Sequence, residues 1–402
     1  MGHSPNNFLD KKDCRMPFSK TDRHFMAWLV STIFTRLTVT SIPMVSIVGI
    51  AAANGSFVLG GFTSGAYAIG ESVGAIWLTP LLSRRNVKKR LFQGCAVCAL
   101  LLFASGILAV NGAPYNFSVP LLVFITGLLS APIPGVLRSS ISQSSSSPAR
   151  AMSLDNAINQ SSWVIGPVLG VAVVHSFGTL SAFFLLGIFL VIAMMTTPRA
   201  ITNNYHQSSG TESTPDVRIV MNPIVASAVI MAVTASFDTL VPILLTEWSG
   251  TDVRTGWVLA ALAGSSVLIS ALIGVKTRWS GKEKKSAFFT LLVVFLIGAT
   301  GFTYSFPTLM AVAVVLGAFQ APAMIFRQQI IADKVPKNQQ ATAFSYLYAA
   351  GGIGYSLTAA LTPSISKLAN TQCASVAVAV FCLAALVAAH LYTKNNRSPQ
   401  HQ

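Results

Sequence analysis

Residues 84–90 read Arg84-Arg85-Asn86-Val87-Lys88-Lys89-Arg90, and a long apolar stretch lies on each side of this basic run. A second basic run, Lys282-Glu283-Lys284-Lys285, lies between two further apolar stretches in the second half of the chain. Two basic hairpins at matching places in an otherwise apolar chain predict a duplicated membrane protein that crosses the bilayer many times.

The composition supports a chain that is solvated by lipid. Of the 402 residues, 52% are hydrophobic and only 10% are charged, and the mean hydropathy is +0.62. A soluble domain is about a quarter charged, and one bilayer crossing takes roughly 20 apolar residues. The net charge of +15 does not indicate nucleic-acid binding, because the Lys and Arg residues lie in short loops between apolar segments.

The apolar segments predict an all-α membrane protein with twelve transmembrane helices in two six-helix repeats. The segments lie near residues 26–50, 57–81, 91–110, 118–140, 157–175, 180–198, 221–245, 256–276, 286–305, 308–330, 341–363 and 372–392. The predicted domains are a tail (1–25), a first half (26–198), a linker (199–220), a second half (221–392) and a second tail (393–402).

Basic residues gather in alternate loops. Both tails and every second loop are basic, whereas the opposite loops contain only Arg254 and Lys367. Since basic loops stay on the cytoplasmic side, we expect a multi-pass protein of the cytoplasmic membrane with both termini in the cytoplasm.

The two halves resemble each other in sequence. Gly127-Leu-Leu-Ser-Ala131-Pro132 corresponds to Gly317-Ala-Phe-Gln-Ala321-Pro322, and Arg138 corresponds to Arg327 with a shift of one residue. Pro148 and Gly166 recur at the same spacing as Pro336 and Gly354. Two parallel repeats of this kind predict a substrate site between the halves, near the middle of the membrane.

With these features the chain resembles the major facilitator superfamily of secondary transporters. The family's loop signature has a Gly, an Asp-Arg pair, another Gly and then basic residues. Arg85, Lys88 and Lys89 fit this signature, whereas Arg84 stands at the position of the Asp and the glycines are absent. The resemblance implies that this loop contributes to a gate.

The fifth segment is similar to a signature of the family's proton-coupled exporters. It reads Trp163-Val-Ile-Gly166-Pro167-Val-Leu-Gly170-Val171, in which Gly166, Pro167 and Gly170 fit and Val171 replaces the last Gly. Glycines allow helices to approach closely, and a proline bends a helix. We therefore expect a hinge or a rocking surface here.

Charged residues inside the predicted segments are the best candidates for a site, because they are costly in lipid. Arg36 and Glu71 each lie about 15 Å deep at 1.5 Å per residue. They predict an ion pair, which either senses protons and substrate or clamps two helices. Asp238 either carries a proton, meets a cationic substrate, or faces water in an outer vestibule.

Polar side chains in later segments are candidates for a substrate cavity. Gln320, Tyr346 and Tyr348 lie beside Pro322 and the pair Gly351-Gly352. Arg138 and Arg327 lie near the cytoplasmic ends of their segments, where long side chains reach toward the interface, and we expect them to act as anchors.

The sequence thus favours a secondary transporter that moves a small solute by alternating access, with protons as the coupling ion and efflux as the direction. An uptake symporter of the same fold and a membrane sensor without transport are the alternatives. Because the chain has no GxxxxGK[ST] loop and no HExxH motif, we expect no catalytic residues, no metal and no other cofactor. The expected partners are the solute, H+ and lipid, without nucleic acid, and the protein is expected to be a monomer.

Overall fold

The computed structural model describes residues 23–78, 86–112, 117–144, 148–201, 216–275, 280–336 and 339–395. Within these ranges the ordered elements are helices, and there is no strand. This confirms the predicted all-α class. Helices satisfy every backbone hydrogen bond within one segment, which hydrocarbon demands. Most of the predicted linker and of the two predicted tails lies outside the described residues.

The first half of the chain forms helices that cover the first six predicted segments. They are α1 (Arg23–Met44), the π-helical η2 (Val45–Gly49), α2 (Ile50–Asn54), α3 (Phe57–Val73), the π-helical η3 (Gly74–Leu78), α5 (Val87–Asn111), α6 (Ser118–Ser130), α7 (Pro132–Ser144) and α8 (Pro148–Ala200). Gly178, with φ 84° and ψ 169°, interrupts α8. The chain turns there, so α8 contains both the fifth and the sixth predicted segment.

The second half forms helices that cover the other six segments. They are α9 (Val217–Ser249), α10 (Thr255–Val275), α11 (Lys282–Thr300), α12 (Phe306–Lys334), α13 (Gln340–Leu368) and α14 (Thr371–Asn395). In the described part of the chain, eight helices are long and apolar enough to cross a membrane. The protein is therefore a multi-pass integral membrane protein.

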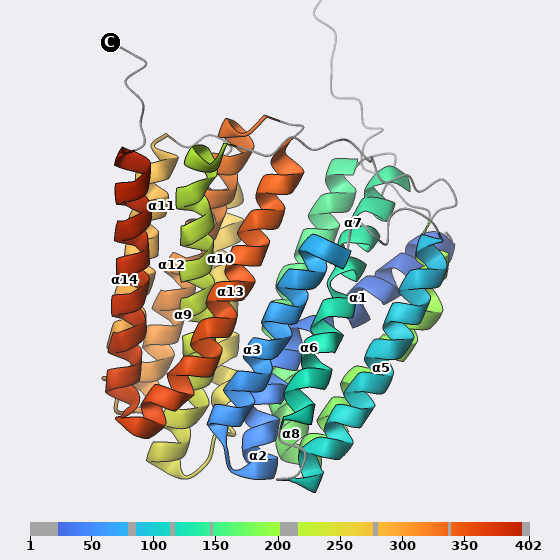
Figure 1. Ribbon diagram of the computed structural model, residues 1–402, viewed down its shortest axis with the longest axis horizontal. Coiled ribbons are helices and arrows are strands. Elements are labelled where there is room, and N and C mark those ends of the chain that lie inside the picture. The colour runs from blue at the N-terminus through green and yellow to red at the C-terminus, as the bar shows by residue number, and fades with distance from the viewer. Residues whose placement is uncertain are drawn as a thin grey trace, which may run out of the picture.

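The helices form two bundles that stand side by side (Figure 1). One bundle contains α1 to α8 and the other contains α9 to α14. The first helix begins and α14 ends at the same end of the molecule, which we call the terminus side; the opposite end is the far side. Lys88–Arg90 and Lys282–Lys285 both lie on the terminus side, because they open helices that run from this end.

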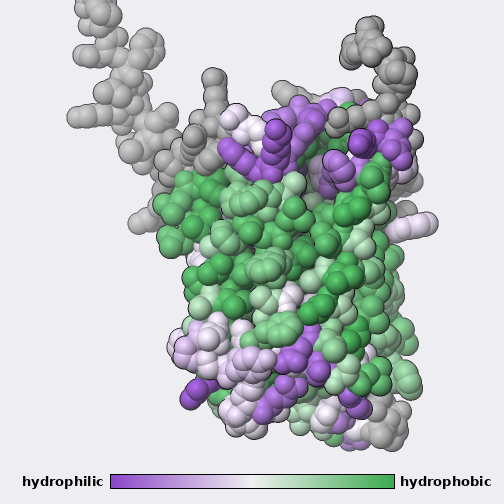
Figure 2. Space-filling view, turned by 90° about the vertical axis from the view of Figure 1, so that its left-hand side faces the viewer, coloured by the Kyte–Doolittle hydropathy of each residue, from purple (hydrophilic) through white to green (hydrophobic). Residues whose placement is uncertain are grey.

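An apolar belt surrounds the molecule. Figure 2 shows hydrophobic residues across the middle of one face and hydrophilic residues toward both ends. Large apolar side chains stand outward on several helices, such as Leu100 on α5, Phe295 on α11 and Ile353 on α13, which are 65%, 72% and 60% exposed. An apolar surface of this extent is suited to lipid tails.

The two bundles contact each other through α3 and α13 on the far side. A Cβ atom added at Gly61 of α3 would lie 2.2 Å from the carbonyl oxygen of Ala359 on α13. A Cβ atom at Gly352 would lie 1.6 Å from Oγ of Ser72. Only glycine allows this approach of backbone to backbone.

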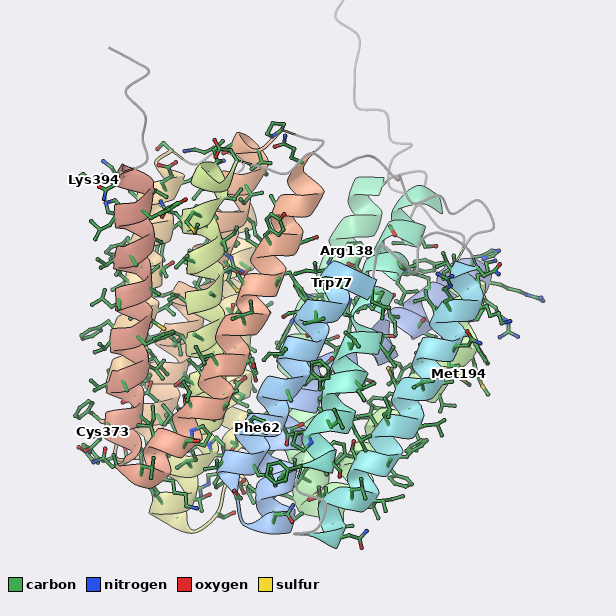
Figure 3. All side chains as sticks on the ribbon, viewed as in Figure 1. Phe62, Trp77, Arg138, Met194, Cys373 and Lys394 are labelled. Carbon is green, nitrogen blue, oxygen red and sulfur yellow. The ribbon has the colours of Figure 1, made fainter. Side chains whose placement is uncertain are left out.

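The same two helices separate toward the terminus side (Figure 1). Phe344 and Tyr348 lie one turn apart on α13, at its terminus-side end, and are 38% and 49% exposed. Trp77, which Figure 3 labels in η3, beyond the terminus-side end of α3, is 72% exposed. The two bundles therefore meet closely on the far side, and α3 and α13 diverge toward the terminus side.

Candidate functional site

A buried network of charges ties α1, α7 and α8 together. Both carboxylate oxygens of Asp155 lie 3.0 Å from Nη2 of Arg36. Nε of Arg138 donates to Oδ2 of Asp155 at 2.5 Å, and Nη1 of Arg36 donates to Asn159. Asp155 has an exposed fraction of 0%. One buried carboxylate thus pairs with two guanidinium groups, which leaves the group of three with a net positive charge.

The predicted ion pair between Arg36 and Glu71 is not formed in this structure. Arg36 pairs with Asp155 instead, while Glu71 lies near enough to Arg36 for an electrostatic interaction without a salt bridge. The sequence interpretation missed Asp155 because the fifth segment was predicted to begin at residue 157. The helix begins at Pro148, which places Asp155 inside it. Asp155 and Asn159 share a helix face at a spacing of four residues, and this was the available signal.

Glu71 forms a hydrogen bond between the two bundles. The hydroxyl of Tyr348, on α13, donates to the carboxylate of Glu71, on α3. Glu71 is adjacent to Ser72, which contacts Gly352 at the closed interface. The bond therefore lies at the terminus-side edge of the contact between α3 and α13. Any motion that changes how these helices meet must stretch or break it.

Asp238 has a similar partner inside the second bundle. The hydroxyl of Tyr355 donates to Oδ2 of Asp238 at 2.9 Å. Tyr348 and Tyr355 are seven residues apart on α13, so they lie on the same helix face. One face of α13 thus presents a hydroxyl to a carboxylate in each bundle. For Asp238 the structure therefore favours an interior position over the outer vestibule.

The predicted cavity residues on α12 and α13 have different surroundings. Nε2 of Gln320 donates to Oγ1 of Thr234, on α9, at 2.7 Å, and its Oε1 atom is buried without a hydrogen-bond partner among the described residues. Tyr348 reaches Glu71, as described above. Tyr346 lies two residues away on a different face of α13 and is half-buried.

The predicted gate and hinge motifs lie at two separate places. Arg85 is outside the described residues, and Lys88 and Lys89 lie in the first turn of α5 on the terminus side. Gly166 packs on α1 of its own bundle, where Ser41 donates to its carbonyl oxygen at 2.9 Å.

The motif of α8 meets the second bundle through a residue between its glycines. A Cβ atom at Gly170 would lie 3.0 Å from Val45, which belongs to the first bundle. Val168 instead lies next to Gly256 of α10, because a Cβ atom added at Gly256 would lie 3.5 Å from Cα of Val168. The glycines Gly166 and Gly170 therefore hold α8 against the first bundle, and a different face of the helix contacts the second bundle.

A contact between a histidine and an aspartate joins the bundles on the far side. Nε2 of His175, on α8, lies 3.0 Å from Oδ1 of Asp252, in the loop between α9 and α10. Burial raises the pKa of Asp252, and the nearby His175 partly opposes this increase. This contact and the contact between α3 and α13 lie at the same end of the molecule, where the two bundles meet.

Comparison with known structures supports the same architecture. The structure of a bacterial homologue of the human lysosomal transporter Spinster, inward-facing and unoccupied, has a TM-score of 0.72 and 13% identity, covering 95% of this chain and 100% of that chain. The structure of the POT family transporter PepTSo has a TM-score of 0.70 and 11% identity, covering 96% of this chain and 100% of that chain. The structure of the nucleoside transporter NupG has a TM-score of 0.67 and 13% identity, covering 93% of this chain and 99% of that chain. At these identities the likeness concerns the fold.

The sequence comparison identifies the family. No curated protein sequence matches the chain. The sequence profile of the Major Facilitator Superfamily matches twice, over residues 25–285 and 224–402, and the two matches together cover nearly all of the chain. The chain belongs to the Major Facilitator Superfamily and is a transporter rather than an enzyme.

Proposed function

We propose that this transporter exports a small solute by alternating access and that protons drive the export. The two bundles rock against each other, and the solute binds between them. The observation that carries the proposal is the hydrogen bond from Tyr348 to Glu71, which joins the two bundles at the edge of their contact. A carboxylate at this position responds to the motion that transport requires.

Three carboxylates inside the bundles fall into two classes. Asp155 forms salt bridges with two arginines, and we assign it a structural role. Glu71 and Asp238 each accept a hydrogen bond from a tyrosine, and neither belongs to a salt bridge among the described residues. A carboxylate without a cation is costly inside a membrane, and a bound proton removes that cost. Glu71 and Asp238 are therefore the proposed proton carriers.

Glu71 and Asp238 differ in how the motion affects them. Tyr355 and Asp238 belong to one bundle and move together, whereas Tyr348 and Glu71 belong to different bundles. Rocking therefore separates Glu71 from its hydroxyl donor and changes its hydration. We assign the coupling step to Glu71 and a supporting role to Asp238.

Two features support export as the direction of transport. The basic residues gather on the terminus side, which corresponds to the cytoplasm under the bias of basic loops, so the conformation observed is the one that loads solute from the cytoplasm. Gly166, Pro167 and Gly170 also resemble the exporter signature. Both features support export by a protein of the cytoplasmic membrane.

Flux measurements in proteoliposomes test the proposal. The protein is reconstituted with a trapped pH-sensitive dye, a pH gradient is imposed, and a panel of small organic solutes is added one at a time. We expect at least one solute to move in exchange for protons. Glu71→Gln should abolish movement against a gradient and retain exchange of solute across equal concentrations.

Glu247→Gln is the control, because Glu247 is an exposed carboxylate on α9 that accepts a hydrogen bond from Thr371 within the second bundle. This variant should behave like the unaltered protein. Solute binding without flux would favour a sensor, and unchanged proton coupling in Glu71→Gln would contradict the assignment.

A further inference from the structure

A buried arginine in α12 has no acceptor for two of its nitrogen atoms. Arg327 is 5% exposed, and its Nε and Nη1 atoms are buried without a hydrogen-bond partner among the described residues. It lies seven residues before the helix ends at Lys334, which is about 10 Å at 1.5 Å per residue. The expectation that Arg327 reaches the interface as an anchor is therefore wrong, because its guanidinium lies inside the bundle.

Two carboxylates at this end of the second bundle are already paired. Lys282 donates to Asp333 at 2.6 Å, and Lys334 donates to Glu283. A buried guanidinium that lacks a counterion is strongly unfavourable. An anionic ligand would supply the counterion that the described residues do not give Arg327.

The internal repeat shows where the missing partner belongs. Arg138 is the counterpart of Arg327 in the first bundle, shifted by one residue. The guanidinium of Arg138 is neutralised by Asp155 of the helix that follows it. Because Pro148 and Pro336 are equivalent, as are Gly166 and Gly354, the same spacing can be applied to every residue between them.

Both acceptors of the first bundle are replaced by apolar residues in the second. At the repeat spacing Asp155 corresponds to Ala343, and Asn159 corresponds to Leu347. Ala343 and Leu347 have exposed fractions of 0% and 4%, and they pack in one apolar cluster with Ile331, which lies one turn after Arg327. The second bundle therefore retains the cation and lacks the groups that would neutralise it.

A second unpartnered atom lies deeper on the same face of α12. Gln320 precedes Arg327 by seven residues, so the two side chains share a face about 10 Å apart. Oε1 of Gln320 is buried and accepts no hydrogen bond among the described residues. An acceptor at this depth is suited to a hydroxyl or amine of a bound molecule.

We propose that Arg327 binds the oxyanion group of the transported solute, a carboxylate or a phosphate, and that Gln320 accepts a hydrogen bond from the other end of that solute. A planar guanidinium binds such groups through two parallel hydrogen bonds. In this proposal the solute approaches from the terminus side, toward which α3 and α13 diverge (Figure 1). This inference rests on the proposed transport function and specifies the class of its substrate.

Anion binding to the full-length protein in detergent tests the inference. The probes are sodium succinate and inorganic phosphate, with sodium chloride at equal ionic strength as the reference, and the readout is the melting temperature against probe concentration. We expect at least one probe to raise the melting temperature by several degrees. Arg327→Gln should weaken that response at least tenfold, and a response to one probe alone identifies the preferred oxyanion.

Two further variants complete the design. Arg254→Gln removes an exposed arginine of the second bundle on the far side and should respond like the unaltered protein. Ala343→Asp restores the carboxylate that the repeat lacks, so it should stabilise the protein without a probe and weaken the response at least tenfold. If Arg327→Gln does not fold, Ala343→Asp decides the question.

Some outcomes overturn the inference. They are an unaltered protein that responds to neither probe, an Arg327→Gln protein that responds normally, and an Ala343→Asp protein that responds normally. The measurement requires no flux, so it fails independently of the proposed function. If the protein responds to anions but transports nothing, the proposed function fails and the anion site stands. If the protein transports a solute and Arg327→Gln does not change that transport, the proposed function stands and Arg327 is not the site of solute binding.

Discussion

Replacing Asp155 by Asn tests the buried network most directly. The substitution keeps the shape of the side chain and removes the charge that neutralises Arg36 and Arg138. Breaking a buried ion pair by removing one partner destabilises a protein by about 3–5 kcal/mol. Since Asn retains one acceptor oxygen, we take about 3 kcal/mol. At about 2–4 °C per kcal/mol for a unit of this size, the melting temperature should fall by about 6–12 °C.

The assay is thermal unfolding of the purified protein in detergent, with Asp333→Asn as the control. Asp333 pairs with the single cation Lys282, and its side chain is 54% exposed. An exposed pair contributes about 0–1 kcal/mol, so the control should change the melting temperature by no more than a few degrees. Asp155→Asn combined with Arg36→Gln should recover part of the loss, because it removes one of the two unpaired cations.

The reasoning is refuted if Asp155→Asn lowers the melting temperature no more than Asp333→Asn does. That result would mean that water reaches Asp155 and screens the pair, in spite of its exposed fraction of 0%. The network would then not stabilise the first bundle, and the contrast between Asp155 and the proposed proton carriers would no longer hold.

Three further predictions concern the contacts between the bundles. Tyr348→Phe removes the hydrogen bond that joins the bundles at Glu71, worth about 0.5–1.5 kcal/mol. Spin-label distances across the far side should therefore show about a two- to tenfold loss of closed molecules; unchanged distances would contradict this. Gly61→Val should prevent far-side closure and increase the labelling of far-side cysteines, because a Cβ atom at Gly61 would lie 2.2 Å from a backbone carbonyl oxygen. Gly264→Val is the control and should have neither effect, because no atom lies within 4 Å of a Cβ atom added at Gly264. Burial raises the pKa of Asp252 in the closed state, so this state binds a proton more tightly than an open, hydrated one. Acidification should therefore favour far-side closure, and this pH effect should disappear as the pH rises through the raised pKa of Asp252. The pH effect should also be absent in Asp252→Asn. The same cysteine-labelling assay at several pH values checks both expectations.

Much of the fold could be predicted from the sequence, because lipid imposes a strong and simple constraint. The segment predicted at 308–330 corresponds to α12, Phe306–Lys334, and the segment predicted at 372–392 corresponds to α14, Thr371–Asn395. Helix ends extend past the apolar runs, since polar residues continue a helix into the interface. This extension is why the segment predicted at 157–175 does not include Asp155.

The site was harder to predict because its contacts join distant segments. Glu71 and Tyr348 were both candidates, but nothing in the spacing of the chain indicates that α3 and α13 meet at that level. The predicted partner of Glu71 was Arg36, chosen for its similar depth on an adjacent segment. The position of a residue within its segment predicts its depth in the membrane. It does not predict which way the side chain points around the helix axis. Packing of the bundle determines that direction.

The two repeats have the same fold and differ in how they treat charge. In the first bundle Asp155 accepts hydrogen bonds from Arg36 and Arg138 and fixes α8 against α1 and α7. In the second bundle Ala343 and Leu347 stand at the positions of Asp155 and Asn159, so Arg327 has no carboxylate partner among the described residues, and Oε1 of Gln320 accepts no hydrogen bond there. An arginine paired with a carboxylate favours rigidity, whereas an arginine without one favours a ligand. We infer that the duplication led to a division of roles, in which the first bundle supplies the coupling carboxylate Glu71 and the second supplies most of the recognition.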